Sequence, residues 1–555
     1  MKNYLLPSAQ GPIKAGTTIL EEKPFAFILS AKEQGFRCDH CFAKGKVLKC
    51  SGCQYIHYCG RGCQKDAWPE HKAECNGYRK VLPRVPPDAA RLMARLIRKL
   101  ANGGGHQRGH YTNTFFRVWK DLMSHYHELK VDNRRMEHFT SLCAVLFQFL
   151  TDISLPNSVE LMGIYGRMCV NGFSILDPEM LSIGTGIYLG ASIVDHSCDP
   201  NAVAVFDGTT INIRTLKDMP TLDWSKIFIS YIDLLNTPFE RQTELQMTYY
   251  FLCQCSVCLD PHQISLMHAA QCPNKGCDYP VQIPWREDIK IVIREDENKS
   301  ESIGEASRKK DKDNIQNGGS NHRESTFNEP ETNGGPKTND VTNTRSLTNG
   351  CDNISNGGVM SLSNGFGELS VKENGRDGYC DGEDVNDFAL ECPKCKEEIT
   401  KEFVNKFKEV MDFTHLHLQN MRDKSISYVD VCRSCLEKQE GVLHPLSLFH
   451  VQTLDLAMDG CLQYEFWDQA MKYAGLLLPG FKNFYGDLHP MYGLLLVKLG
   501  KLQLYAEKPN EALVSLTAAA AVLKITHGSQ HPLWRDSLTP LMRQAEAETS
   551  AIVHF

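Results

Sequence analysis

Cysteines are the residues of this sequence whose type and spacing most clearly indicate a chemical role, namely metal binding. The chain has 22 of them in 555 residues, and most stand in close C-x2-C, C-x-C or C-x3-C pairs. The first residues, Met1 to Pro7, contain no long apolar core, so we do not expect a secretory signal. Disulfides are rare in the reducing cytosol and nucleus, and closely paired thiols there predict zinc ligands.

The densest cysteine cluster lies at residues 38–75 and contains eight metal ligands. They follow one another as Cys38-x2-Cys41, Cys50-x2-Cys53, Cys59-x3-Cys63 and His71-x3-Cys75. Zinc is held by four ligands in a tetrahedron, so this set predicts two ions. We expect the pairs to interleave, with one ion on Cys38, Cys41, Cys59 and Cys63 and the other on Cys50, Cys53, His71 and Cys75. This pattern resembles the MYND finger, whose ions must supply folding free energy because so short a segment has little core.

Further motifs follow downstream in a fixed order. They are Asn171-Gly172-Phe173, Asp195-His196-Ser197-Cys198, Ile229-Ser230-Tyr231-Ile232-Asp233 and Tyr249-Tyr250-Phe251-Leu252-Cys253-Gln254-Cys255-Ser256-Val257-Cys258. With the finger after the first strands and a helical C-terminus, this order resembles the SMYD family, the SET and MYND domain-containing protein lysine methyltransferases. The stretches at 84–88, 457–459 and 497–504 look most similar to the third member of that family.

The resemblance implies methyl transfer from S-adenosylmethionine to lysines of histone or non-histone proteins. Such an in-line displacement needs a neutral, aligned amine that is shielded from water, and an apolar channel lowers the pKa of a lysine by desolvation. The family pattern makes Tyr231 the catalytic residue, and Phe173, Tyr231 and Tyr249 the lining of the lysine channel.

The same resemblance supplies a cofactor site and a third zinc site. The residues that match cofactor contacts are His125, Asn171, Ser192, Val194, Asp195, His196, Tyr249 and Phe251. The residues that match the ligands of the third zinc are Cys198, Cys253, Cys255 and Cys258. This ion would tie the post-SET tail to the active site and so close the lysine channel.

Three positions depart from the family pattern. The family's N-terminal Gly-x-Gly turn corresponds to Tyr4-Leu5-Leu6, where side chains would block the close backbone approach that glycine permits. Asp195 replaces the asparagine that precedes the histidine, and residues 224–227 replace a Gly-Glu-Glu-Leu stretch. Either weakened cofactor binding or an incomplete or alternatively spliced N-terminus would account for them. The alternative function is therefore a catalytically weak scaffold that recruits protein partners in transcriptional regulation.

The remaining cysteine pairs give a candidate fourth zinc site. Cys272-x4-Cys277 and Cys392-x2-Cys395 each have a proline after the first cysteine, as zinc knuckles often do. A long loop costs only about (3/2)RT ln n to close, so a zinc ribbon could span the residues between them. The pair Cys432-x2-Cys435 competes for this role, and exposed thiols are the alternative.

The strand-like and helix-like stretches predict an α+β multidomain fold, and the family resemblance implies a β-rich SET core split by the finger. We expect the N-terminal part of the SET domain at 1–37, the finger at 38–75, a helical SET insert at 76–170, the core SET at 171–240, the post-SET at 241–262, a zinc ribbon at 263–400 and a C-terminal helical domain at 401–555. Residues 297–387 are rich in Asn, Gly and Ser and are predicted to be disordered. The C-terminal domain suggests tetratricopeptide-like helix pairs, with breaks at Pro479-Gly480 and Pro509-Asn510.

Composition limits the partners. No run approaches the roughly 18 apolar residues of a membrane span. A net charge of −7 argues against broad nucleic-acid binding, although basic residues of the finger allow a weak DNA contact. Those residues are Lys44, Lys46, Lys49, Arg61, Lys65 and Lys72. We expect a monomer in the nucleus and cytoplasm whose finger binds proline-rich peptides.

Overall fold

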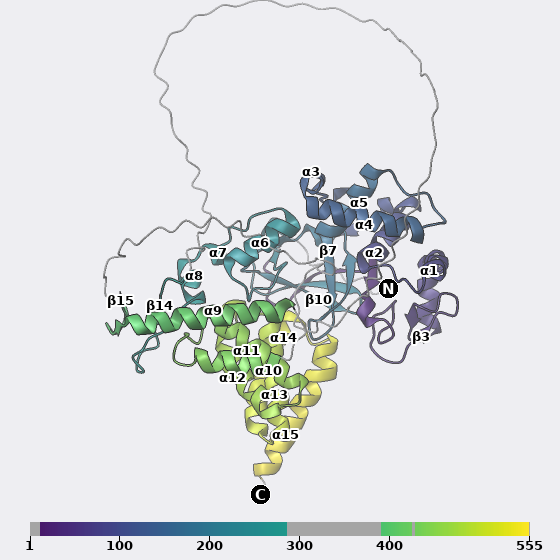
Figure 1. The fold of residues 1–555 in the computed structure, drawn as a ribbon. Helices are drawn as coiled ribbons and strands as arrows, with labels where there is room; N and C mark the ends of the chain where they lie inside the picture. The colour runs from purple at the N-terminus through teal and green to yellow at the C-terminus, as the bar shows by residue number, and fades with distance from the viewer. Residues whose placement is uncertain (1–10, 286–389, 424–427, 554–555) are drawn as a thin grey trace, which may run out of the picture. The chain divides into compact units, whose positions relative to one another are not determined.

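A computed structural model describes residues 11–285, 390–423 and 428–553 (Figure 1). The predicted disordered stretch at 297–387 and the Tyr4-Leu5-Leu6 position lie outside these ranges. In the part described, no helix combines the length and the apolar character that a membrane span needs. Strands, helices and cysteine clusters alternate along the chain, in agreement with the mixed α and β class predicted.

Two small antiparallel sheets join residues from both sides of the cysteine-rich finger. One has the order β1 (Thr18–Glu22), β11 (Thr210–Thr215), β10 (Ala202–Asp207). The other has the order β2 (Ala26–Leu29), β8 (Ser182–Ile187), β7 (Gly172–Leu176). Alternate residues such as Ile211 and Ile213 are fully buried in one apolar cluster, as a period of two requires. The finger and the helices after it are thus inserted between paired strands.

The inserted region contains short hairpins and five helices. The hairpins are β3 (Leu48–Lys49) with β4 (His57–Tyr58), and β5 (Gly109–His110) with β6 (Phe116–Arg117). The helices are α1 (Arg61–Val81), α2 (Asp88–Ala101), α3 (Tyr126–Val131), α4 (Asn133–Phe149) and α5 (Ser158–Asn171). In α2 the residues at helical spacing, Ala90, Met93, Ala94 and Ile97, are all buried. Asp132 and Asn157 cap α4 and α5 with their side-chain oxygens.

Short elements follow the sheets and carry the later motifs. They are β9 (Asp195–His196), which pairs in parallel with β12 (Phe228–Ile229), then α6 (Pro238–Tyr249), α7 (Ser256–Leu259) and α8 (Pro261–Met267). The hairpins β13 (Ala270–Gln271) with β14 (Pro280–Val281) and β15 (Leu390–Glu391) with β16 (Glu398–Ile399) come next. A capping box of Thr237 and Glu240 fixes the start of α6.

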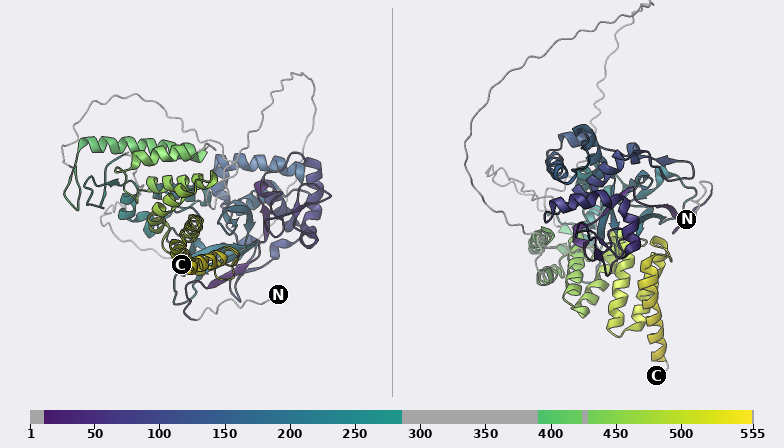
Figure 2. Two further views of the ribbon diagram at one scale, coloured as in Figure 1. Left: turned by 90° about the horizontal axis from the view of Figure 1, so that it is seen from below. Right: turned by 90° about the vertical axis from the view of Figure 1, so that its right-hand side faces the viewer.

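Helices make up most of the described residues from 401 onward, as predicted (Figures 1 and 2). They are α9 (Lys401–Asp423), α10 (Tyr428–Gln439), α11 (Leu448–Gln463), α12 (Trp467–Tyr485), α13 (Pro490–Tyr505), α14 (Pro509–Thr526) and α15 (Thr539–Val553). Consecutive helices from α10 to α14 pack on one another.

The predicted break at Pro479-Gly480 is wrong, because α12 continues through both residues. A proline inside a helix removes one hydrogen bond, yet packing of the flanking residues outweighs that loss here. Leu477 and Phe481 are buried, and a Cβ on Gly480 would lie 2.5 Å from the side chain of Val451. The break at Pro509 is confirmed, since this proline begins α14.

Candidate active site and metal centres

The structure gathers the eight finger residues into two groups of four. One group is Cys38, Cys41, Cys59 and Cys63, and the other is Cys50, Cys53, His71 and Cys75. Within each group the ligand atoms lie within 4.8 Å of one another. Helix α1 presents His71 and Cys75 one turn apart, while Cys50 and Cys53 lie in the loop of hairpin β3–β4 and Cys59 follows β4 directly. The second group is fully buried, while Cys59 of the first is exposed.

The distances between sulfur atoms test whether zinc fits. Zinc binds thiolates at about 2.3 Å, so a tetrahedral site separates its sulfur atoms by about 3.8 Å. The Sγ of Cys41 lies 3.8 Å from that of Cys59, and the Sγ of Cys50 lies 3.9 Å from that of Cys75. His71 Nε2 lies 3.4 Å from the Sγ of Cys50. The donor set and its spacing therefore fit two zinc ions.

The third predicted set, Cys198, Cys253, Cys255 and Cys258, also comes together. The Sγ of Cys198 lies 4.0 Å from that of Cys253 and 3.5 Å from that of Cys258. The buried guanidinium of Arg241, on α6, donates to the Sγ of Cys258 at 3.6 Å. A cation at this place would offset the negative charge that four thiolates carry on a zinc ion.

A fourth group consists of Cys272, Cys277, Cys392 and Cys395. The competing pair is not part of it. Cys432 and Cys435 lie buried on α10, where the Sγ of Cys432 contacts the Sδ of Met421 at 3.7 Å. The prediction that Cys432-x2-Cys435 could complete the site is therefore wrong, because the packing of α10 buries these two thiols in the apolar core.

Aromatic rings surround Tyr231. Its ring centroid lies 5.0 Å from that of Tyr249 and 5.3 Å from that of His196. The His196 ring lies 5.9 Å from Phe251. Phe173, the other predicted channel residue, packs edge-on against Tyr188 at 5.7 Å in the apolar cluster that Tyr231 also contacts. Tyr231 thus packs directly on Tyr249 of helix α6, while Phe173 of strand β7 belongs to the apolar cluster against which Tyr231 also packs.

Two hydrogen bonds hold Tyr231 in place. Its hydroxyl donates to the carbonyl oxygen of Val194 at 2.5 Å, and its backbone N–H donates to His196 Nδ1 at 3.0 Å. The parallel pairing of β9 with β12 sets this register. Burial and the nearby Asp195 carboxylate raise the pKa of Tyr231 well above its usual value. The hydroxyl therefore stays protonated at neutral pH and remains a hydrogen-bond donor.

Three predicted cofactor residues, His196, Tyr249 and Phe251, belong to this cluster, and the other five come from α5, the residue before α3 and residues 192–195. Asn171, at the end of α5, donates through Nδ2 to the carbonyl oxygen of Met123 at 2.8 Å. His125 has a left-handed backbone and packs its ring 5.3 Å from that of Tyr250. Ser192 lies in a 3-10 turn over Ala191–Ile193 and donates to the carbonyl oxygen of Leu189 at 2.9 Å. Asp195 is exposed, and Val194 is buried.

Two residues outside the predicted set hold the segment that carries Ser192 and Val194. The carboxylate of Glu22 accepts from the backbone N–H of Gly190 at 2.9 Å and of Ala191 at 2.8 Å. Arg117 donates to the Oγ of Ser192 at 3.2 Å and also to its carbonyl oxygen. Burial raises the pKa of Glu22, although these N–H groups lower it. Nothing local in the sequence marks either residue, since their partners lie 168 and 75 positions away.

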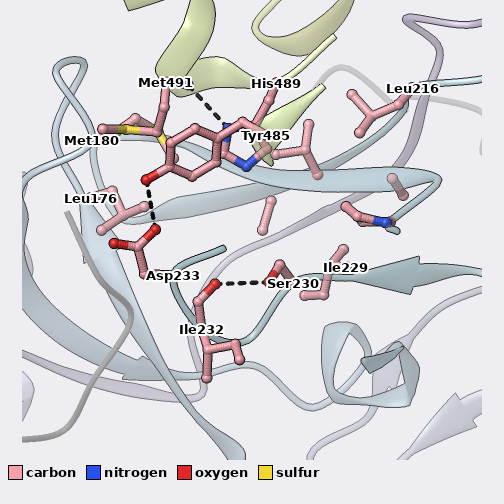
Figure 3. A pocket seen from close by; sticks show the side chains of 14 residues that line it. Leu176, Met180, Leu216, Ile229, Ser230, Ile232, Asp233, Tyr485, His489 and Met491 are labelled. Carbon is pink, nitrogen blue, oxygen red and sulfur yellow. Dashed lines mark hydrogen bonds between the residues drawn. The ribbon is translucent and has the colours of Figure 1, made fainter. Parts of the chain in front are cut away.

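A pocket lies beside the Tyr231 segment (Figure 3). Ser230, Ile232 and Asp233 line it from one side, and Tyr485 and His489 of the C-terminal region from the other. Figure 3 shows the Tyr485 hydroxyl directed at Asp233, and this hydroxyl donates to Oδ1 at 2.6 Å. Tyr231 is not among the lining residues and instead packs on His196 and Tyr249, so the pocket and the aromatic cluster share one short segment.

Comparison with known proteins agrees with this arrangement. The MYND finger family model matches residues 38–75. Human "Histone-lysine N-methyltransferase SMYD3" is 23% identical over 97% of this chain and 95% of its own length. "Histone-lysine N-methyltransferase ASHR1" of Arabidopsis thaliana is 24% identical over 97% of this chain and 92% of its own length.

The similarity over nearly the whole chain, together with the matching finger, supports membership of the SMYD family. Another SMYD protein, human "N-lysine methyltransferase SMYD2", is 30% identical over 44% of this chain and 56% of its own length. Similarity to more than one SMYD protein leaves the assignment to the third member a prediction. The described residues include one cysteine group beyond the three that the family resemblance implies.

Proposed function

We propose that this chain is a protein-lysine N-methyltransferase that uses S-adenosylmethionine and acts on lysines of histone or other proteins. The observation that carries the proposal is the aromatic cluster of Tyr231, Tyr249, His196 and Phe251, with the Tyr231 hydroxyl bonded to a backbone carbonyl. Relatives that match nearly the whole chain bear the name histone-lysine N-methyltransferase. Residues 11–37 and 171–240 form the SET core in this proposal, and residues 76–170 its insert.

The residues of the cluster suit the needs of methyl transfer. When bound, S-adenosylmethionine supplies an electrophilic methyl group. The rings of Tyr231, Tyr249 and Phe173 exclude water from the lysine side chain, which favours its neutral, nucleophilic form. Aromatic faces also attract the positive charge of a lysine or a sulfonium. Val194 and Tyr231 fix one end of this channel, while Asn171, Ser192 and His196 line the cofactor side.

The pocket beside Asp233 is the approach for the substrate peptide in this proposal. Asp233 places a carboxylate at the pocket, and the Tyr485 hydroxyl holds it. A carboxylate there favours a lysine-bearing, cationic peptide over an acidic one. The C-terminal helices, which we assign to a tetratricopeptide-like domain, supply the opposite wall through Tyr485 and His489.

The finger serves protein recognition in the same proposal. It binds proline-rich peptides, with a weak DNA contact through its lysines. We propose that the chain acts as a monomer in both nucleus and cytoplasm.

Calorimetric titration of the zinc-loaded chain with S-adenosylmethionine tests the proposal. We expect binding in the micromolar range, and a similar affinity for Tyr231→Phe, because this change removes a hydroxyl of the lysine channel and keeps the ring. Absence of binding would contradict the enzyme and favour the scaffold, which is supported by the three departures from the family pattern, among them the exposed Asp195.

A further inference from the structure

The fourth cysteine group lies outside the proposed active site. Its members come from two hairpins, with Cys272 and Cys277 between β13 and β14 and Cys392 and Cys395 between β15 and β16. The Sγ of Cys272 lies 3.5 Å from that of Cys395, and the Sγ of Cys277 lies 3.8 Å from that of Cys392. These separations match the roughly 3.8 Å between sulfur atoms around a tetrahedral zinc.

Each hairpin has the backbone of a metal knuckle. The N–H of Cys277 donates to the carbonyl of Asn274 at 2.9 Å, and the N–H of Lys396 donates to the carbonyl of Cys392 at 2.9 Å. Lys396 adopts a left-handed conformation at φ 62°, which lets the chain reverse behind Cys395. Both turns aim their two thiols at the same point, and Cys272, Cys277 and Cys392 are at most 6% exposed.

The hairpins themselves cannot account for this arrangement. Each ladder pairs only two residues with two, which is far too short to be stable alone in water. Three buried thiols and the partly exposed Cys395 give little apolar burial in return for the order imposed on both turns. A bound ion would supply the missing folding free energy, as it does in other small metal-binding units.

The first hairpin is tied to the C-terminal helices. The N–H of Gln271 donates to the carbonyl of Val442 at 2.8 Å, and the N–H of His444 donates to the carbonyl of Ala269 at 3.0 Å. His444 Nε2 lies 3.0 Å from the carbonyl oxygen of Asp278. The segment between α10 and α11 therefore extends the hairpin, so the cysteines sit at a junction of elements.

The second hairpin leads directly into α9. Ile399 of β16 is buried two residues before this helix begins at Lys401. The first hairpin also leads back to α9, because Trp285 donates through Nε1 to Asp412 Oδ1 at 3.0 Å. Lys394 links the hairpins through an ion pair of 2.5 Å with Asp278. Residues on both sides of 286–389 thus converge on one helix and one cysteine group.

We propose that Cys272, Cys277, Cys392 and Cys395 bind a fourth zinc ion that makes residues 270–281 and 390–399 fold as a single zinc ribbon. The ion joins two stretches that lie more than a hundred residues apart in sequence and fixes the start of α9. This site is structural, since all four positions are taken by thiolates and none is left for a substrate or water. The proposal does not depend on methyltransferase activity.

Native mass spectrometry of the full chain, purified without chelator, counts the ions. We expect four zinc ions in the wild type and three in the double variant Cys392→Ala/Cys395→Ala. The matched control is Cys432→Ala/Cys435→Ala, which changes another buried C-x2-C pair and keeps four. Three ions in the wild type, or no difference between the wild type and the Cys392/Cys395 variant, would overturn the proposal.

Hydrogen exchange gives a readout that a general loss of folding would not reproduce. In the Cys392/Cys395 variant we expect faster exchange at residues 270–281, 390–401 and 442–444, with unchanged protection at the finger and in β7, β8 and β10. Unchanged exchange at the two hairpins, or equal loss across the whole chain, would contradict a local zinc ribbon.

Discussion

At the scale of single residues, Glu22 holds the segment that carries Ser192, a residue of the proposed cofactor site. Its two carboxylate oxygens accept separate N–H groups from Gly190 and Ala191, just before Ser192. In Glu22→Gln an NH2 group would face one of these donors, and an unsatisfied buried donor costs about 1–3 kcal/mol. We expect the affinity for S-adenosylmethionine to fall about tenfold by calorimetry. Glu21→Gln, in the exposed neighbouring position of β1, should leave it unchanged; equal losses in both variants would refute this role.

Glu244 makes stability depend on pH. Burial and the nearby Asp233 and Glu240 raise the pKa of Glu244 from 4.5 to about 7. The folded state then holds a proton that the unfolded chain has lost, so ionisation of Glu244 costs stability as pH rises from 4.5 through 7. Glu244→Gln cannot ionise. Between pH 6 and 8 we expect its free energy of unfolding to rise relative to wild type by about 1 kcal/mol. Urea titrations at both pH values measure this, and parallel pH curves would contradict it.

Much of the residue-level site follows from sequence because its signals are local. The finger ligands recur at two- and three-residue spacings that zinc geometry requires, and Tyr231 stands in a fixed order of motifs. Glu22 and Arg117 could not be found in this way. Their hydrogen bonds join them to residues that only the folded chain brings near, and a lone acid in a strand is ordinarily a surface residue.

At the scale of elements, the finger depends on a close approach of backbone to metal ligand. A Cβ built on Gly52 would lie 2.7 Å from the Sγ of Cys75 and 3.7 Å from that of Cys50. Gly52→Ala must therefore displace a ligand of the second finger site. We expect zinc to leave this site at least tenfold faster when a chelator competes for it.

Gly62 provides the control for this change. It lies in the first turn of α1, where an added Cβ would meet no atom within 4 Å. Gly62→Ala should keep the wild-type rate of zinc release and slightly favour the helix. If Gly52→Ala released zinc no faster than Gly62→Ala, the packing of the second site would differ from that described.

Some ends of helices can be predicted from local sequence signals, and others cannot. The sequence predicts the helical stretches and the start of α14 at Pro509, because a proline suits the first turn of a helix. It does not predict that α12 runs through Pro479. That outcome depends on contacts of Gly480 and Phe481 with other helices, and a single sequence does not record such contacts.

At the scale of the whole described chain, the C-terminal helices are fastened to the β-rich part by specific polar contacts. Arg214 of β11 donates through Nε to the carbonyl of Ile525 in α14 at 3.0 Å, and through Nη1 to the Oγ1 of Thr18 at 2.6 Å. His531 Nε2 lies 2.8 Å from the carbonyl oxygen of Phe206 in β10. These contacts, with the hydrogen bond from Tyr485 to Asp233, join the C-terminal helices to strands β10 and β11 and to the segment after β12.

The central claim is methyl transfer to protein lysine, and the most direct test is a transfer assay on the zinc-loaded chain with labelled S-adenosylmethionine and histones. Mass spectrometry then locates the added methyl groups. We expect label on lysine side chains, and at least a hundredfold slower transfer with Tyr231→Phe, since positioned groups of this kind contribute about 10²–10⁴-fold. Tyr165→Phe, which loses a hydroxyl 2.8 Å from His138 on α4, should keep the wild-type rate. Transfer that Tyr231→Phe leaves intact, or methylation of any residue other than lysine, would contradict the account.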